Sequence, residues 1–274
     1  MKKLIFIPKN YNEALELKDY YDGVILSVDN LSINYPVFTM DEIIDLTQKL
    51  NDKEIFINLN KNMHNSDMDN LKQTINVLET LNIKGILFYD LSIPNIKPNI
   101  DLVWSQCHMT TNKETCNYWY KRGVKYTFLS NEITLNEIKE IKENTNSELM
   151  IQVFGYIPIF TSKRNLVKNY KKTFNLKDNS KINYIKHEND LYPIVDDKQT
   201  VVYNKNIQNL IEELKKLENI NINYFVINSF EIENIKEVLE NFKNGKIFKI
   251  DNEGKGFLYE ETIYKVKKWR NQNY

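Results

Sequence analysis

Short apolar runs alternate along the chain with longer stretches in which apolar residues recur at the spacing of a helix face. The runs are rich in β-branched residues and apolar almost throughout, as is typical of parallel strands covered on both faces. They lie at residues 4–7, 23–28, 55–59, 85–89, 102–105, 126–129, 149–154 and 224–228. This alternation predicts repeated βα units, and eight such strands favour a single (β/α)8 TIM-type barrel over an open sheet.

The stretches between the runs have the pattern of amphipathic helices. Apolar residues gather on one side of residues 40–50, 71–81 and 207–217, which predicts a helix over each range. Thr39 with Glu42, and Thr134 with Glu137, have the spacing of capping boxes that open two helices.

Glycine is scarce, with seven residues in the chain, and its placement supports the same interpretation. Gly23, Gly85 and Gly123 each fall between a predicted helix and the strand that follows it. We interpret all three as residues just past a helix end, where a positive φ favours glycine.

One interval breaks the βα rhythm. Residues 161–204 are polar and contain two short apolar runs, 192–195 and 200–203, on either side of Asp196. They predict a small β-hairpin inserted after the seventh strand. Residues 245–274 then form a closing segment, with a helix expected over 259–269. Because 274 residues is close to the ~250 typical of one barrel, we expect residues 1–274 to form a single domain.

Composition narrows the class of protein. The 37 Lys and Arg balance the 37 Asp and Glu, so no overall positive field attracts nucleic acid, although a local basic patch can. Two cysteines do not make a disulfide scaffold. The apolar part of the first ten residues is shorter than a signal peptide core, and residues 149–160 fall short of the ~20 that span a bilayer. We therefore expect a cytoplasmic protein that does not associate with membranes.

Candidate chemistry lies where the predicted strands end, because a barrel carries its functional residues at the carboxyl ends of its strands. Each polar residue there is equally compatible with a plain loop cap, but together they mark one polar end. The predicted pocket is lined by Asn58, Asn60, Asp90, Gln106, Glu132 and Gln152, with Arg164 reaching in from the inserted loop.

Common motifs are absent from the sequence. It contains no G-x-S-x-G, Walker A or G-x-G-x-x-G pattern, and its three histidines lack metal-ligand spacing, so no metal site is predicted. The basic run from Lys163 to Lys172 is either a solvated loop or an anion-binding element; Arg164 within it has the planar fork that suits carboxylate or phosphate.

Three stretches resemble the collagenase-like peptidases of family 32. The first, residues 23–90, contains G-V-I-L-S-V, I-F-I-N-L-N and G-I-L-F-Y-D; the second, W-S-Q-C-H-M-T-T-N at 104–112, continues to F-L-S-N-E-I-T-L-N-E-I, which aligns Glu132. The third is V-F-G-Y-I-P-I-F-T-S-K-R-N at 153–165, and the end G-K-G-F-L-Y-E-E-T-I-Y-K-V is also similar to family members. The resemblance covers nearly the whole chain.

The resemblance implies a peptidase-like hydrolase that acts at the barrel mouth on a peptide or small anionic ligand, with Glu132 as candidate acid or base. It implies an alternative as well, a non-proteolytic barrel that binds RNA or another partner through Lys163–Lys172, because some members support RNA hydroxylation. Those members carry four cysteines that hold an iron–sulfur cluster. Here Asn165 stands where the first is expected and no cysteine follows Cys116, so we predict no cluster and no other cofactor.

Overall fold

The computed structural model describes residues 2–33, 36–106, 108–178, 180–196 and 199–260. Eight parallel strands form a closed barrel, in which each strand pairs with the next and the last pairs with the first. They are β1 (Lys3–Ile7), β2 (Gly23–Val28), β4 (Glu54–Leu59), β5 (Gly85–Phe88), β6 (Leu102–Trp104), β7 (Tyr126–Phe128), β8 (Glu148–Gly155) and β14 (Tyr224–Asn228). The predicted (β/α)8 barrel is confirmed.

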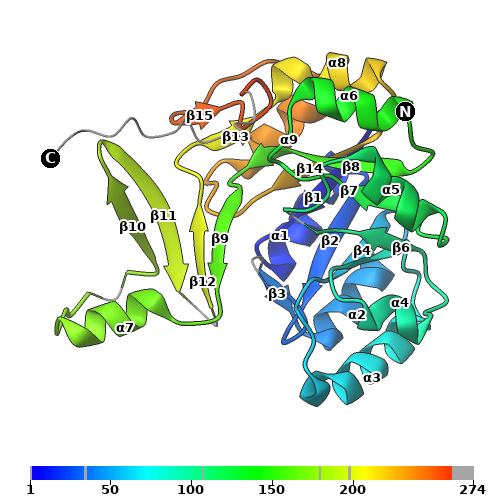
Figure 1. Cartoon of the computed structure of the whole chain (residues 1–274), viewed down its shortest axis with the longest axis horizontal. Helices are drawn as coiled ribbons and strands as arrows, with labels where there is room; N and C mark the ends of the chain where they lie inside the picture. Colours follow the sequence, from blue (N-terminus) through cyan, green and yellow to red (C-terminus); the bar gives the residue numbers. More distant parts are fainter. Residues whose placement is uncertain (1, 34–35, 107, 179, 197–198, 261–274) are drawn as a thin grey trace, which may run out of the picture.

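Helices lie between the strands and cover the outside of the barrel (Figure 1). They are α1 (Tyr11–Glu16), α2 (Met40–Lys49), α3 (Met68–Leu78), α4 (Ser92–Ile96), α5 (Lys113–Tyr120), α6 (Leu135–Glu143), α8 (Leu214–Asn219) and α9 (Ile235–Asn244). Both predicted capping boxes are confirmed, since Thr39 and Thr134 exchange hydrogen bonds with Glu42 and Glu137 at the starts of α2 and α6. Within the described residues, no helix combines the length and apolar character needed to cross a membrane.

Alternating side chains fill the inside of the barrel. Phe56, Tyr126 and Tyr224 meet edge to face near its amino-terminal end, with ring centroids 5.7–6.2 Å apart. The other members of this inner core are apolar: Ile5, Ile7, Ile25, Leu87, Val103, Phe128, Met150 and Val226. The packed interior leaves the carboxyl ends of the strands as the place for a site.

A second sheet projects to one side of the barrel (Figure 1). It consists of β9 (Pro158–Ser162), β10 (Ile182–His187), β11 (Asp190–Asp196) and β12 (Thr200–Tyr203), antiparallel in the order β10-β11-β12-β9, with α7 (Leu166–Thr173) beside it. The predicted hairpin is present as β11 and β12, which pair Ile194 with Val202. The insertion is larger than predicted, because β9 and β10 extend this hairpin on both sides.

Two other predictions need correction. Residues 207–217 are not one helix: β13 (Ile207–Asn209) pairs antiparallel with the end of β8, and α-helix begins only at Leu214. Gly23 and Gly85 are not helix-end residues but the first residues of β2 and β5. A Cβ on Gly23 would lie 2.6 Å from the carbonyl oxygen of Glu54, so close strand packing requires glycine there. Gly123, with φ +86°, has the predicted positive φ.

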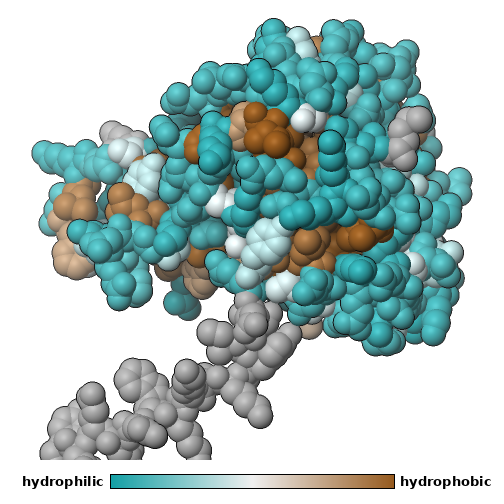
Figure 2. All heavy atoms as spheres, turned by 90° about the horizontal axis from the view of Figure 1, so that it is seen from above, coloured by the Kyte–Doolittle hydropathy of each residue, from teal (hydrophilic) through white to brown (hydrophobic). Residues whose placement is uncertain are grey.

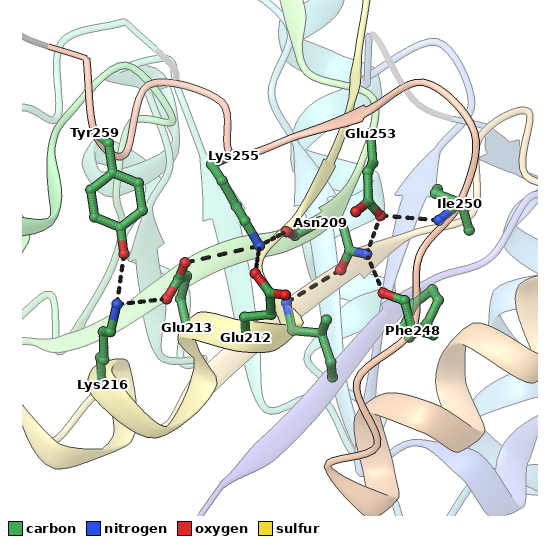
Figure 3. A network of polar contacts seen from close by, with 10 residues as sticks. Asn209, Glu212, Glu213, Lys216, Phe248, Ile250, Glu253, Lys255 and Tyr259 are labelled. Atoms are coloured by element: carbon green, nitrogen blue, oxygen red, sulfur yellow. Dashed lines mark hydrogen bonds and ion pairs between the residues drawn. The ribbon is translucent and has the colours of Figure 1, made fainter.

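A polar network fixes the segment after α9 against β13 and α8 (Figure 3). The Asn209 side-chain amide donates to Glu253 at 2.7 Å, and β15 (Glu253–Gly254) pairs with β13. Lys255 lies 2.7 Å from Glu212 and donates to the carbonyl of Asn209. These contacts hold residues 248–255 beside β13, which itself pairs with the end of β8. Of the predicted closing helix over 259–269, residues 261–269 lie outside the described residues, and residues 259 and 260 are not helical.

Candidate functional site

The carboxyl end of the barrel interior carries a layer of buried polar side chains. In β2, β4, β8 and β14 the residues Ser27, Asn58, Gln152 and Asn228 follow the inner core in the alternation of each strand, and all are buried. The Asn58 side-chain amide donates to the Ser27 hydroxyl at 3.0 Å. This layer contains two predicted site residues, Asn58 and Gln152, and holds no charge.

Backbone partners fix the orientation of two amides in this layer. The Gln152 side-chain nitrogen donates to the carbonyl of Tyr156 at 3.1 Å, and the Asn228 side-chain oxygen accepts from the amide of Phe230 at 3.0 Å. Within the described residues, the Gln152 Oε1 acceptor and the Asn228 Nδ2 donor then have no partner. Buried groups of this kind usually hold water or a small polar ligand.

Three further predicted residues bind the backbone of the mouth loops. Asn60 accepts from the amide of Ile33 at 2.8 Å, and Asp90 accepts from the amide of Met63 at 3.1 Å. Gln106 accepts from the amide of His108 at 3.0 Å. Burial opposes the charge of Asp90, but hydrogen bonds from Ser92 and Met63 outweigh it and lower the pKa of this carboxyl. These side chains therefore shape the mouth loops through hydrogen bonds to their backbone.

Glu132 meets a histidine at the rim. Its Oε1 lies 3.1 Å from Nδ1 of His108, and the side chain of Glu132 is 37% exposed. The Glu132 amide donates to the hydroxyl of Ser130 at 3.1 Å, which fixes the start of this loop. A carboxylate and an imidazole in contact could move a proton for a bound substrate.

Arg164 lies in the insertion, between β9 and α7. Its backbone is held by the hydroxyls of Ser162 and Thr200, and its side chain is exposed. Lys163, the preceding residue, reaches the barrel instead: its Nζ lies 2.9 Å from Nε2 of His64. The structure thus brings Glu132 to the rim and leaves Arg164 on the insertion.

The insertion and the barrel mouth enclose a cleft of about 480 Å³. Apolar side chains form most of its wall. The basic side chains of Lys61, His64 and Lys163 also line it, and no Asp or Glu is among the described lining residues. The full lining is Asn30, Ser32, Ile33, Pro36, Val37, Lys61, His64, Lys163, Val195, Gln199, Val201, Tyr203 and Phe230. Two predicted site residues hold the loops that line this cleft. The Asn60 side chain accepts from the amide of Ile33, and the Asp90 side chain accepts from the amide of Met63, which precedes His64.

Sequence reasoning did not identify the cleft residues as a group. They come from the segments that follow β2, β4 and β14 and from the strands and loops of the insertion. The one signal in the sequence was the basic run that begins at Lys163.

The cysteines do not fit the iron–sulfur cluster that the family resemblance implies for some members. Such a cluster takes about four thiolates, and the chain has two cysteines. Cys116 is fully buried, and burial raises the pKa of its thiol to about 11. Within the described ranges, no group of three or more His, Cys, Asp and Glu residues could hold a metal ion.

The chain is similar in sequence to two proteins of Bacillus subtilis. The chain is 29% identical over 187 residues to tRNA hydroxylation protein P2 of Bacillus subtilis (strain 168), covering 64% of this chain and 60% of that protein. It is 26% identical over 180 residues to tRNA hydroxylation protein P1 of the same organism, covering 62% of this chain and 42% of that protein. The chain therefore spans about half the length of these curated relatives.

Two further comparisons concern fold and family. The tryptophan synthase α-subunit of Pyrococcus furiosus superposes with a TM-score of 0.50 at 12% identity, covering 90% of this chain and 98% of that chain, which supports the barrel fold alone. The model of peptidase family U32 matches residues 16–244. A match over most of the barrel and the whole insertion means that this chain belongs to peptidase family U32.

Proposed function

We propose that this protein binds RNA and takes part in its modification, with the insertion as its RNA-binding element. One observation carries the proposal. Residues 161–187 hold eight of the 37 Lys and Arg residues of the chain but only one of its 37 Asp and Glu residues. Positive charge is thus concentrated in residues 161–187 of a chain with zero net charge, and Lys163 of this stretch lines the cleft.

Exposed apolar side chains accompany this charge. Tyr170 lies on α7 and Phe174 directly follows this helix, with ring centroids 4.7 Å apart, and Tyr184 lies on β10. The exposed large apolar residues of the insertion are Phe160, Leu166, Tyr170, Phe174, Leu176, Tyr184, Ile185 and Leu191. Figure 2 shows brown apolar atoms beside teal polar ones on this projecting part. Lysines that neutralise phosphates, next to rings on which bases stack, are typical of single-stranded RNA-binding surfaces.

The curated relatives support the same proposal. Two of them are named tRNA hydroxylation proteins, and their matched regions cover more than half of this chain. Because the cysteines do not fit a cluster, we assign this chain the binding of RNA and no oxygen-transfer step.

A salt titration tests the proposal. We expect a single-stranded RNA to bind with a log–log salt slope of about −0.7 for each phosphate contacted. The double variant Lys168→Ala, Lys172→Ala removes two exposed lysines of α7 and should make the slope shallower by about 1.4. The matched control Lys215→Ala, Lys236→Ala removes two lysines from α8 and α9 and should leave the slope unchanged. Binding without salt dependence would contradict the proposal.

Peptide hydrolysis is the second candidate, favoured by the contact between His108 and Glu132 at the rim and by the family name. It predicts cleavage of an unfolded polypeptide or a peptide that Glu132→Gln abolishes without loss of folding. Turnover that survives Glu132→Gln would remove the role of this carboxylate.

A further inference from the structure

We propose that the cleft between the insertion and the barrel mouth binds one nucleotide of an RNA strand. The base would occupy the apolar part of the cleft and the phosphate would meet its basic edge. This inference rests on the proposed RNA binding and adds to it the site, the unit that is bound and the orientation of that unit.

The apolar part suits a flat, uncharged ring system. Tyr203 from β12 and Phe230 from the loop after β14 stack with ring centroids 4.5 Å apart and an angle of 20° between their planes. Val201 on the insertion and Ile33 and Val37 on the barrel complete the apolar walls. A base placed between such walls gains burial and stacking without needing a charged partner.

The basic edge suits a phosphate. Lys163 comes from the insertion, and its Nζ lies 2.9 Å from Nε2 of His64 on the barrel, so the ammonium and the imidazole meet at this edge of the cleft. Lys61 also lines the cleft, but it lies 2.9 Å from Asp67, which offsets its charge. Lys163 is therefore the principal cation of this edge.

Size and construction favour a single nucleotide over a duplex. A volume of about 480 Å³ lies in the range of small-molecule pockets, ~300–1,000 Å³, and is far too small for a double helix. Enzymes that modify a base commonly turn it out of the strand into such a pocket. The walls come from both the insertion and the barrel, so the insertion would hold the strand and present one nucleotide to the mouth.

The first experiment measures binding of the four nucleoside 5′-monophosphates, each against its own nucleoside. Because base and phosphate are recognised at separate parts of the cleft, at least one monophosphate should bind 10-fold or more tightly than the matching nucleoside. Val37 is 41% exposed and lines the cleft, so Val37→Trp should fill the cleft without disturbing the core and weaken this binding at least 10-fold. The matched control is Val77→Trp on α3, where Val77 is 38% exposed outside the cleft.

The second experiment compares two lysines of the insertion. Lys163→Ala should remove the preference for monophosphate over nucleoside, whereas Lys168→Ala on α7 should leave it unchanged and weaken only RNA. If RNA binds with the expected salt slope but no monophosphate is preferred, or if Val37→Trp and Val77→Trp behave alike, the nucleotide site is wrong and the RNA proposal stands. If RNA does not bind at all, the proposed function fails; monophosphate binding that Val37→Trp abolishes would still support the cleft as a nucleotide site.

Discussion

The barrel and the insertion are built in opposite ways from the same chain. Barrel helices bury part of their surface, as α2 does with Ile43 and Leu46, whereas no residue of α7 or β10 is buried. The barrel carries most of the acidic residues, and residues 161–187 are almost entirely basic among their charged positions. Because α7 and β10 bury no residue, we expect the barrel to provide most of the stability and the exposed surface of these two elements to be free for binding.

The largest expected effect is the difference in unfolding free energy between an alanine variant in the barrel core and one in the insertion. Phe56→Ala empties a fully buried position of the inner core beside Tyr126 and Tyr224, so the free energy of unfolding should fall by about 3–5 kcal/mol. Tyr184→Ala on β10 removes a ring that is 60% exposed and should change it by about 0.5 kcal/mol or less. Denaturant unfolding of both variants measures the difference. Equal losses would mean that the insertion contributes a core of its own.

Capping at the first turns of α2 and α7 gives a smaller difference in stability between the two regions. Thr39 accepts from the amide of Glu42 at the start of α2, so Thr39→Ala should cost about 1 kcal/mol of unfolding free energy. Asn165 stands at the start of α7 without a side-chain capping bond, so Asn165→Ala should cost close to nothing. The same denaturant curves test this pair. A loss at Asn165 as large as at Thr39 would contradict the contrast.

The smallest expected effect is a change in the stability of the protein at acidic pH, caused by Asp90 at the barrel mouth. The pKa of Asp90 is lowered in the folded state, so its ionised form stabilises the protein fully above the unfolded value of ~3.9. That contribution is lost as the pH falls from there through the folded pKa. Asp90→Asn should therefore make stability less dependent on pH below about 4 and leave the pH dependence near neutrality unchanged. Identical acid unfolding curves would show that the hydrogen bonds from Ser92 and Met63 do not select the ionised form.

Sequence pattern predicts the barrel well because each parallel strand is a local, nearly continuous apolar run. It fails at residues 207–217 because the apolar spacing that suits a helix also suits a strand followed by a short helix. Pairing of Gln208 with Gly155, which the pattern does not encode, decides between them. The mouth residues Asn60 and Asp90 are located correctly at strand ends, but only the fold reveals that they bind loop backbone. The cleft depends on contacts such as Lys163 with His64, 99 residues apart, and local pattern carries no record of these.

The proposed division between a stabilising barrel and an RNA-binding insertion is tested most directly by photochemical crosslinking of single-stranded RNA to the protein. Mass spectrometry then identifies the crosslinked peptides. Our account predicts crosslinks in residues 160–187, where Tyr170, Phe174 and Tyr184 are exposed, and at Phe230 in the cleft. The double variant Lys168→Ala, Lys172→Ala should reduce all of them together. Crosslinks confined to the barrel helices α3, α5 and α6, unaffected by that variant, would contradict it.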